Sequence, residues 1–72
     1  MTNSFDWRSL RSMDVLQFAI GVISGREFYD RYRNTPLGGK VRNLLRLRGV
    51  TRARELARRA AKRAANRMNK VS

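Results

Sequence analysis

The run of sequence after Thr51 constrains the fold more than any other part of the chain, because it contains neither glycine nor proline. Alanine, the strongest helix former, is frequent in this run, and Thr51 is a suitable N-cap. We therefore predict a helix from Arg52 to about Asn69, roughly 27 Å long. It would be the longest element of a chain of 72 residues.

This predicted helix is amphipathic, and its apolar face consists almost entirely of alanine. At about 100° per residue, the apolar side chains fall within one half of its circumference: Ala53, Leu56, Ala57, Ala60, Ala61, Ala64, Ala65 and Met68. A face of small residues buries little area but allows close approach to another helix or to a partner. The basic residues occupy the other half, where they can meet phosphates.

Charge and aromatic residues divide the chain into two unequal parts. Residues 1–34 hold five basic and four acidic side chains, together with all six aromatic residues. Residues 35–72 hold twelve basic side chains and one carboxylate, so eleven of the twelve net positive charges lie there. This asymmetry indicates that one part packs and the other meets a polyanion. We predict a compact helical protein-binding region over residues 1–49 and a basic Ala/Arg-rich helix over residues 50–72.

Two short helices are predicted in the aromatic part. Ser12 suits an N-cap, and the nearly continuous apolar run that follows it predicts a central helix over residues 13–23. Ser24 and Glu27 have the spacing of a capping box, which predicts a second helix over residues 26–33.

A third helix is predicted to begin at Thr35-Pro36, as an N-cap followed by proline in the first turn, and to run to Arg48. An alternative start at Lys40 stays open, because two glycines weaken the first turn. Gly49 suits a C-cap position. The predicted fold class is all-α, a compact three-helix N-terminal region followed by a long basic amphipathic C-terminal helix. The predicted core is Val15, Leu16, Phe18, Ala19, Ile20, Val22, Ile23, Phe28, Tyr32, Val41, Leu44, Leu45 and Leu56.

Cysteine and histidine are both absent. Their absence removes the thiolate nucleophile, the zinc knuckle, the disulfide and the usual general base. The few carboxylates are not spaced as paired acids, and no glycine-rich phosphate loop is present. We therefore predict a binding protein and not an enzyme, with no cofactor, metal or small-molecule substrate. No apolar run approaches about 18 residues, so we expect neither a secretory signal nor a membrane span, and a cytoplasmic location.

The basic residues are the candidate nucleic-acid contacts. Arginine's planar fork suits phosphate, and the absence of aromatic residues from the basic part argues against base stacking, so we expect contact with RNA or DNA backbone that is largely independent of base sequence. The candidates are Arg42, Arg46, Arg52, Arg54, Arg58, Arg59, Lys62, Arg63, Arg67 and Lys70.

The basic part allows three other interpretations. An acidic protein surface is an open alternative partner. An anionic membrane is not favoured, because interfacial helices carry bulky apolar residues where this one carries alanine. A helix-turn-helix centred on Gly49 is not favoured either, because it would bury Arg48, Glu55 and Arg58.

The chain length and the stretch from Thr51 to Lys70, TRARELARRAAKRAANRMNK, resemble small transcription regulators of bacteriophages that bind bacterial RNA polymerase, such as that of a lytic Xanthomonas phage. This resemblance implies polymerase binding near the RNA exit channel, inhibition of initiation, antitermination, and location in the bacterial host cytoplasm. We expect Phe5, Trp7 and Tyr29 to contact the protein partner, since aromatic residues are enriched at interfaces. The alternative is an autonomous nucleic-acid-binding or ribonucleoprotein structural protein, such as a ribosome-associated or genome-packaging protein.

Overall fold

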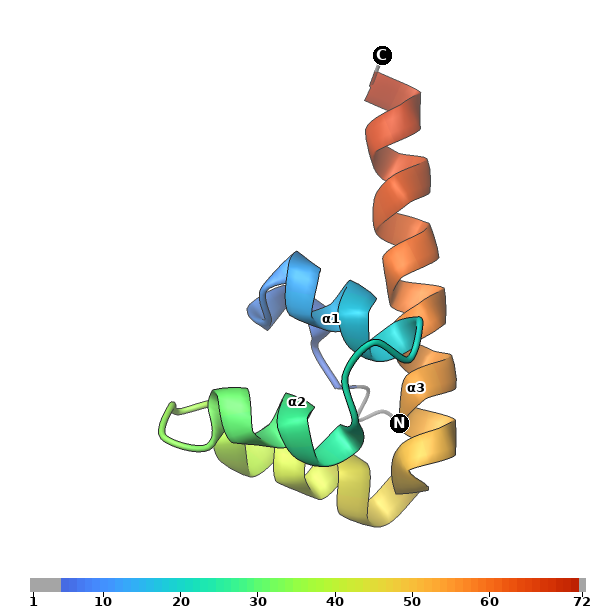
Figure 1. Cartoon of the computed structure of the whole chain (residues 1–72). Coiled ribbons are helices and arrows are strands. Elements are labelled where there is room, and N and C mark those ends of the chain that lie inside the picture. Colours follow the sequence, from blue (N-terminus) through green and yellow to red (C-terminus); the bar gives the residue numbers. More distant parts are fainter. Residues whose placement is uncertain (1–4, 72) are drawn as a thin grey trace.

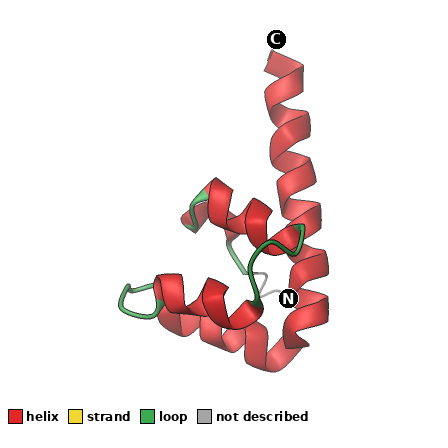
Figure 2. Cartoon of the chain, in the orientation of Figure 1, coloured by secondary structure: helices red, strands yellow, loops and turns green. Residues whose placement is uncertain are grey.

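The computed structural model describes residues 5–71, with side chains as far as Arg67. Within that range the chain is all-helical and contains no strand (Figure 2). A single 3₁₀ turn, η1 (Trp7–Ser9), precedes the helices α1 (Ser12–Ala19), α2 (Gly25–Tyr32) and the long α3 (Gly38–Val71). Both short helices pack against α3, which rises past α1 to the C-terminal end of the chain (Figure 1).

Gly49 divides α3 into two legs that run in different directions (Figure 1). Its φ of 80° and ψ of 157° are non-helical and suit glycine, which lacks the Cβ that makes a positive φ costly. The predicted break at Gly49 is therefore confirmed. We call residues 38–48 the first leg and residues 50–71 the second leg. The second leg begins two residues before the predicted start at Arg52, because helical geometry resumes directly after the glycine.

The helix α1 is shorter than its apolar sequence predicts. It ends at Ala19 and not at Ile23, because Gly21 adopts a φ of 84° and turns the chain away. Ser12 is not its N-cap, since that position belongs to Arg11 and has no side-chain capping bond. The predicted central helix is therefore a two-turn helix with one face toward the core.

The start of α2 is confirmed in part. The Oγ of Ser24 accepts a hydrogen bond from the backbone N–H of Glu27, as predicted, at 3.1 Å. The carboxylate of Glu27 does not complete the capping box, because it pairs with Arg31 at 3.2 Å one turn further along α2. The helix therefore has the expected N-cap with a different use for the acidic residue.

The start of α3 lies between the two predicted positions. The Oγ1 of Thr35 donates to the carbonyl of Tyr32 at 2.7 Å and accepts from the N–H of Leu37 at 3.2 Å. These bonds hold residues 35–37 in a turn, and the helix begins at Gly38. Thr35 thus organises the turn before the helix and is not its N-cap.

Stacked aromatic rings form the centre of the core. The rings of Phe18 on α1 and Phe28 on α2 are nearly parallel, with centroids 4.4 Å apart, and both side chains are fully buried. Tyr32 meets Phe28 edge-on, and Val41 of the first leg is fully buried beside them. Such stacked pairs add to the stabilisation that comes from buried area.

The predicted core is partly right. Eight of its members are buried and two, Leu45 and Leu56, are half-buried: the eight are Val15, Phe18, Ala19, Ile23, Phe28, Tyr32, Val41 and Leu44. Leu16, Ile20 and Val22 are exposed, because only one side of α1 faces the other helices. Leu10, Ala53 and Ala57 were missed and are buried.

A buried carboxylate links α1 to α2. Asp14 of α1 accepts hydrogen bonds from the hydroxyl of Tyr32 and the guanidinium of Arg31, both at 2.6 Å. Burial, the largest single influence, would raise the pKa of Asp14, but the hydrogen bonds from Tyr32 and Arg31 and the positive charges of Arg31 and Arg11 together hold the pKa below its ordinary value. The Tyr32 hydroxyl also accepts from the backbone N–H of Arg11 at 3.0 Å, so it ties the start of α1 to the end of α2.

Candidate nucleic-acid interface

The second leg changes its surroundings part-way along its length. Ala53 and Ala57 are fully buried in the same core as Phe18, and Ala60 and Ala61 are half-buried. From Lys62 to Arg67 every side chain is exposed. The alanine face is therefore a packing surface over residues 53–61 and an uncovered surface beyond them, where α3 projects above α1 (Figure 1).

Four cations of the second leg are exposed and have no carboxylate partner among the described residues. They are Arg58, Lys62, Arg63 and Arg67. Two more, Arg52 and Arg59, are exposed but share the carboxylate of Glu55, at 2.8 and 3.3 Å. Exposed helical pairs of this kind are weak, so a phosphate can replace Glu55 at little cost. The side chain of Lys70 lies outside the described residues.

Arg54 has a different role from its neighbours. Its Nε donates to the carbonyl of Phe18 at 2.9 Å, and its Nη2 donates to the carbonyl of Ile23 at 3.2 Å. Its guanidinium carbon also lies 5.0 Å from the centroid of the Phe18 ring. A cation is favourable at the C-terminal end of a helix, where backbone carbonyls lack helical partners. Arg54 is therefore committed to holding the second leg against α1, and we remove it from the candidate interface.

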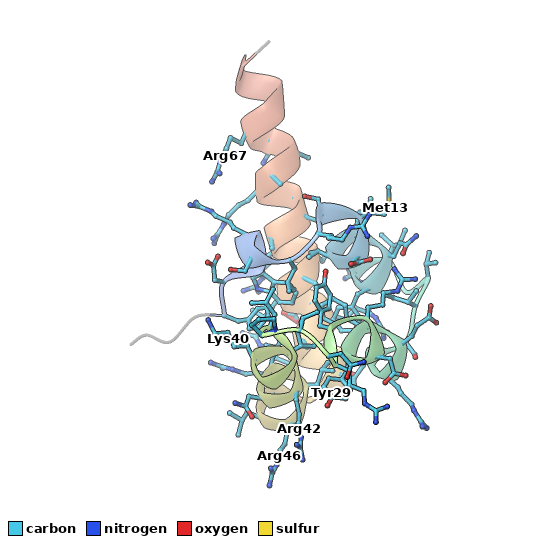
Figure 3. The ribbon with its side chains drawn as sticks, turned by 90° about the vertical axis from the view of Figure 1, so that its left-hand side faces the viewer. Met13, Tyr29, Lys40, Arg42, Arg46 and Arg67 are labelled. Atoms are coloured by element: carbon cyan, nitrogen blue, oxygen red, sulfur yellow. The ribbon has the colours of Figure 1, made fainter. Side chains whose placement is uncertain are left out.

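The remaining candidates, Arg42 and Arg46, lie on the first leg. They are exposed and one helical turn apart. Figure 3 places them at the end of the molecule opposite to the end near which Arg67 lies. The ten candidate cations therefore do not form one continuous surface, and the second leg supplies the larger group.

The aromatic residues expected at a protein interface pack onto the core instead of standing free. Phe5 meets Trp7 edge-on with centroids 4.9 Å apart, and Trp7 stacks over Phe28 at 6.3 Å. All three candidates, Phe5, Trp7 and Tyr29, are half-buried and pack against the core cluster. Each still exposes part of its ring, so the predicted contact with a protein partner stays a prediction.

Sequence reasoning missed a group of exposed apolar side chains on α1. Met13 and Leu16 of α1 and its C-cap residue Ile20 have the spacing i, i+3 and i+7, and their exposed fractions are 58, 43 and 61%. We call these three residues the apolar stripe. The signal in the sequence was an excess of apolar residues, since an eight-residue helix with a single buried face cannot bury apolar side chains on every side.

The acidic residues that have side-chain contacts serve the fold. Asp6 accepts from the backbone N–H of Arg8 and from Ser9, while Asp14, Glu27 and Glu55 are held in the ion pairs described above. Among the described residues, no group of three or more acidic, histidine or cysteine side chains is placed to hold a metal ion. No helix in the described range combines the length and the apolar character needed to cross a membrane.

No family model matches the sequence, and neither a curated protein nor a solved structure matches it. The function is therefore proposed from the arrangement of side chains and from the sequence resemblance described above.

Proposed function

We propose that this protein is a non-enzymatic regulator of transcription that binds bacterial RNA polymerase and lays the exposed cations of its second leg along RNA or DNA. In this proposal, a three-helix N-terminal region carries a long basic amphipathic helix. The observation that carries it is the continuation of the second leg beyond the core, with Arg58, Lys62, Arg63 and Arg67 exposed and unpaired among the described residues.

The dimensions of this helix suit a phosphate backbone. Arg58 and Arg67 are separated by roughly 14 Å along the helix axis, which spans several phosphates of a nucleic-acid strand. Each phosphate contact releases condensed counterions, so four contacts give a plot of log K against log salt with a slope of about −3 to −4. No aromatic residue follows residue 34, so the interface has no ring on which a base could stack.

In this proposal, the nucleic-acid-binding part of the chain begins later than residue 50. A boundary between residues 49 and 50 would assign Ala53, Arg54 and Ala57 to the nucleic-acid-binding part, although all three contribute to the fold. We place the start of the projecting part at Lys62. Arg58 precedes this point, but it is exposed and has no carboxylate partner among the described residues.

A truncation after Ala61 tests the nucleic-acid part of the proposal. It keeps the buried alanines and Arg54, so the fold is retained, and it removes Lys62, Arg63 and Arg67 together with the residues that follow. Fluorescence anisotropy with a labelled duplex and a labelled RNA hairpin should show a loss of affinity of at least about tenfold and a shallower salt slope. Unchanged affinity and slope for both ligands would show that the projecting part does not bind nucleic acid.

The polymerase as protein partner follows from the sequence resemblance, and it needs a separate test. Purified bacterial RNA polymerase, treated with nuclease, is mixed with the immobilised protein. Retention of polymerase after nucleic acid has been digested supports direct protein contact. If polymerase is retained only while nucleic acid is present, the alternative of an autonomous nucleic-acid-binding or ribonucleoprotein structural protein is correct.

A further inference from the structure

We propose that the corner between the outer face of α1 and the projecting part of α3 binds an acidic amphipathic helix of a partner protein. This inference rests on the proposed function in one respect, because it assigns the surface that meets the protein partner. The observation that carries it is that the apolar stripe of Met13, Leu16 and Ile20 lies beside the alanine face of α3, where Ala60 and Ala61 are half-buried and Ala64 is exposed.

The apolar stripe forms the first wall of this corner. It lies on the side of α1 away from the buried residues Val15, Phe18 and Ala19, and all three of its side chains are exposed. Figure 3 shows Met13 on the side of the molecule that faces the free end of α3. Spacing of i, i+3 and i+7 is the pattern with which one helix packs on another. Methionine at the edge of the stripe can adapt to the side chains of a partner.

The alanine face of α3 forms the second wall. Ala53 and Ala57 are buried against the core, and the same row continues with Ala60, Ala61 and Ala64 as the helix passes α1. Alanine side chains let the backbone of a third helix approach closely, while the longer side chains of the stripe supply most of the apolar contact area. α3 runs in a different direction from α1 (Figure 1), so a partner helix that lies on the outer face of α1 beside α3 contacts both walls.

Charge decides which kind of helix fits. At about 100° per residue, Arg63 and Arg67 border one edge of the alanine face and Arg58 borders the other. Within the described residues, neither wall offers an unpaired carboxylate, since Asp14 is bonded to Tyr32 and Arg31, and Glu55 to Arg52 and Arg59. A helix with an apolar face and acidic flanks is complementary to this surface.

Two other occupants fit less well. A second copy of the chain would bring another net charge of +12 to the same place, and the repulsion opposes association. An anionic bilayer would attract the cations, but a flat surface cannot contact both walls of a corner at once. The apolar stripe is therefore assigned to an acidic helix, and the other two occupants are outcomes of the test.

The test uses the full chain and a synthetic peptide of about 20 residues, long enough to form a helix, with leucine on one face and glutamate on the other. A peptide of identical composition with scattered leucines is the control ligand. Ile20→Gln should weaken peptide binding by at least about tenfold, since it removes a contact of the size of a buried aliphatic side chain. Leu47→Gln is the matched control, because Leu47 is more exposed than Ile20, at 79 against 61%, and lies on the first leg.

We expect Leu47→Gln to change peptide affinity by no more than about twofold, as for an ordinary surface substitution. Met13→Gln provides a second variant of the stripe if Ile20→Gln lowers the content of folded protein. In nuclear magnetic resonance titrations, the peptide should shift amide signals both of α1 and of residues 60–64. Shifts confined to one wall would overturn the corner as the binding site.

Four further results would overturn the proposal. They are absence of peptide binding, equal binding of the scattered control peptide, dimerisation of the protein that Ile20→Gln abolishes, and binding to phosphatidylserine-containing vesicles that depends on Ile20.

Failure of the proposed function is a separate result. Ile20→Gln should leave duplex affinity unchanged, and retention of polymerase without dependence on Ile20 would keep the function and reject this surface.

Discussion

The two parts of the second leg have similar sequences and very different surroundings. Residues 53–61 and residues 62–67 both alternate alanine with basic side chains. In the first part the alanines are buried or half-buried, and Arg54 donates to the carbonyl of Phe18 in α1 and to that of Ile23 in the turn that follows. In the second part all side chains are exposed. The same amphipathic pattern is therefore used for packing where α1 and the core cover it, and its side chains are exposed beyond that point.

The packed part depends on the aromatic centre of the core. Phe18 is fully buried, stacks on Phe28 and lies beneath Arg54. Phe18→Ala should cost about 3–5 kcal/mol, which is comparable with the whole stability expected for a domain of this size. Circular dichroism during thermal melting should show loss of the cooperative transition. A variant that keeps a transition within a few degrees of the wild type would contradict the assigned core.

Alanines of the two parts should respond differently to the same enlargement. Ala57→Leu adds volume where no space exists and should cost about 1–3 kcal/mol in the free energy of unfolding. Ala64→Leu, at an exposed position of the same row, should change that free energy by no more than about 0.5 kcal/mol. Urea denaturation measures both. Equal losses would show that residue 64 is packed, and the division of the leg at Lys62 would be wrong.

Substitution of an arginine in each part should also have different effects, on the stability of the fold in one case and on duplex affinity in the other. Arg54→Gln removes hydrogen bonds to the carbonyls of Phe18 and Ile23 and should destabilise the fold by about 1–2 kcal/mol. Arg58→Gln removes an exposed cation with no carboxylate partner in the described range, and it should lower duplex affinity without a measurable change in stability. Melting temperature and duplex affinity are measured on both variants. If Arg54→Gln were neutral in stability, the second leg would not be held by this residue.

The pH dependence of stability should reveal the contribution of Asp14, which lies on α1, the helix against which residues 53–61 pack. Its pKa in the folded protein lies below the ordinary value of 3.8, because the hydrogen bonds from Tyr32 and Arg31 and the nearby positive charges of Arg31 and Arg11 together outweigh burial. The ionised carboxylate therefore stabilises the fold above its unfolded-state pKa, and this stabilisation is lost as the pH falls through the lower folded-state pKa. Asp14→Asn should be less stable than the wild type near neutrality, and the difference should shrink in acid. A difference that grew in acid would have the wrong sign.

Sequence patterns predicted the helical class, the break at Gly49 and most of the core because each depends on local chemistry. A positive φ requires glycine, an N-cap such as Ser24 needs an acceptor, and large rings such as Phe18 and Phe28 are costly to expose. Each of these features depends on one residue and its close neighbours in the sequence. They do not depend on how the helices are placed in space.

The sequence predictions that were wrong share one cause, because each depends on how the helices are placed relative to one another. Ile20 was assigned to the core because apolar residues surround α1, yet the fold covers only one side of that helix. Arg54 carries the same charge as Arg58, and only the position of the end of α1 distinguishes them. Ala53 and Ala57 are buried while Ala64 is exposed, because the first two alone lie beside α1 and the core.

The central claim, that the projecting cations contact phosphates, is tested by the salt dependence of duplex affinity in two double variants of equal charge. Arg63→Gln/Arg67→Gln changes the projecting part, and Arg8→Gln/Arg33→Gln changes exposed arginines outside the proposed interface. We predict that the first reduces the slope of log K against log salt by about 2 relative to the wild type, and that the second leaves it unchanged. Equal reduction by both, or an unchanged slope in the first, would contradict the claim.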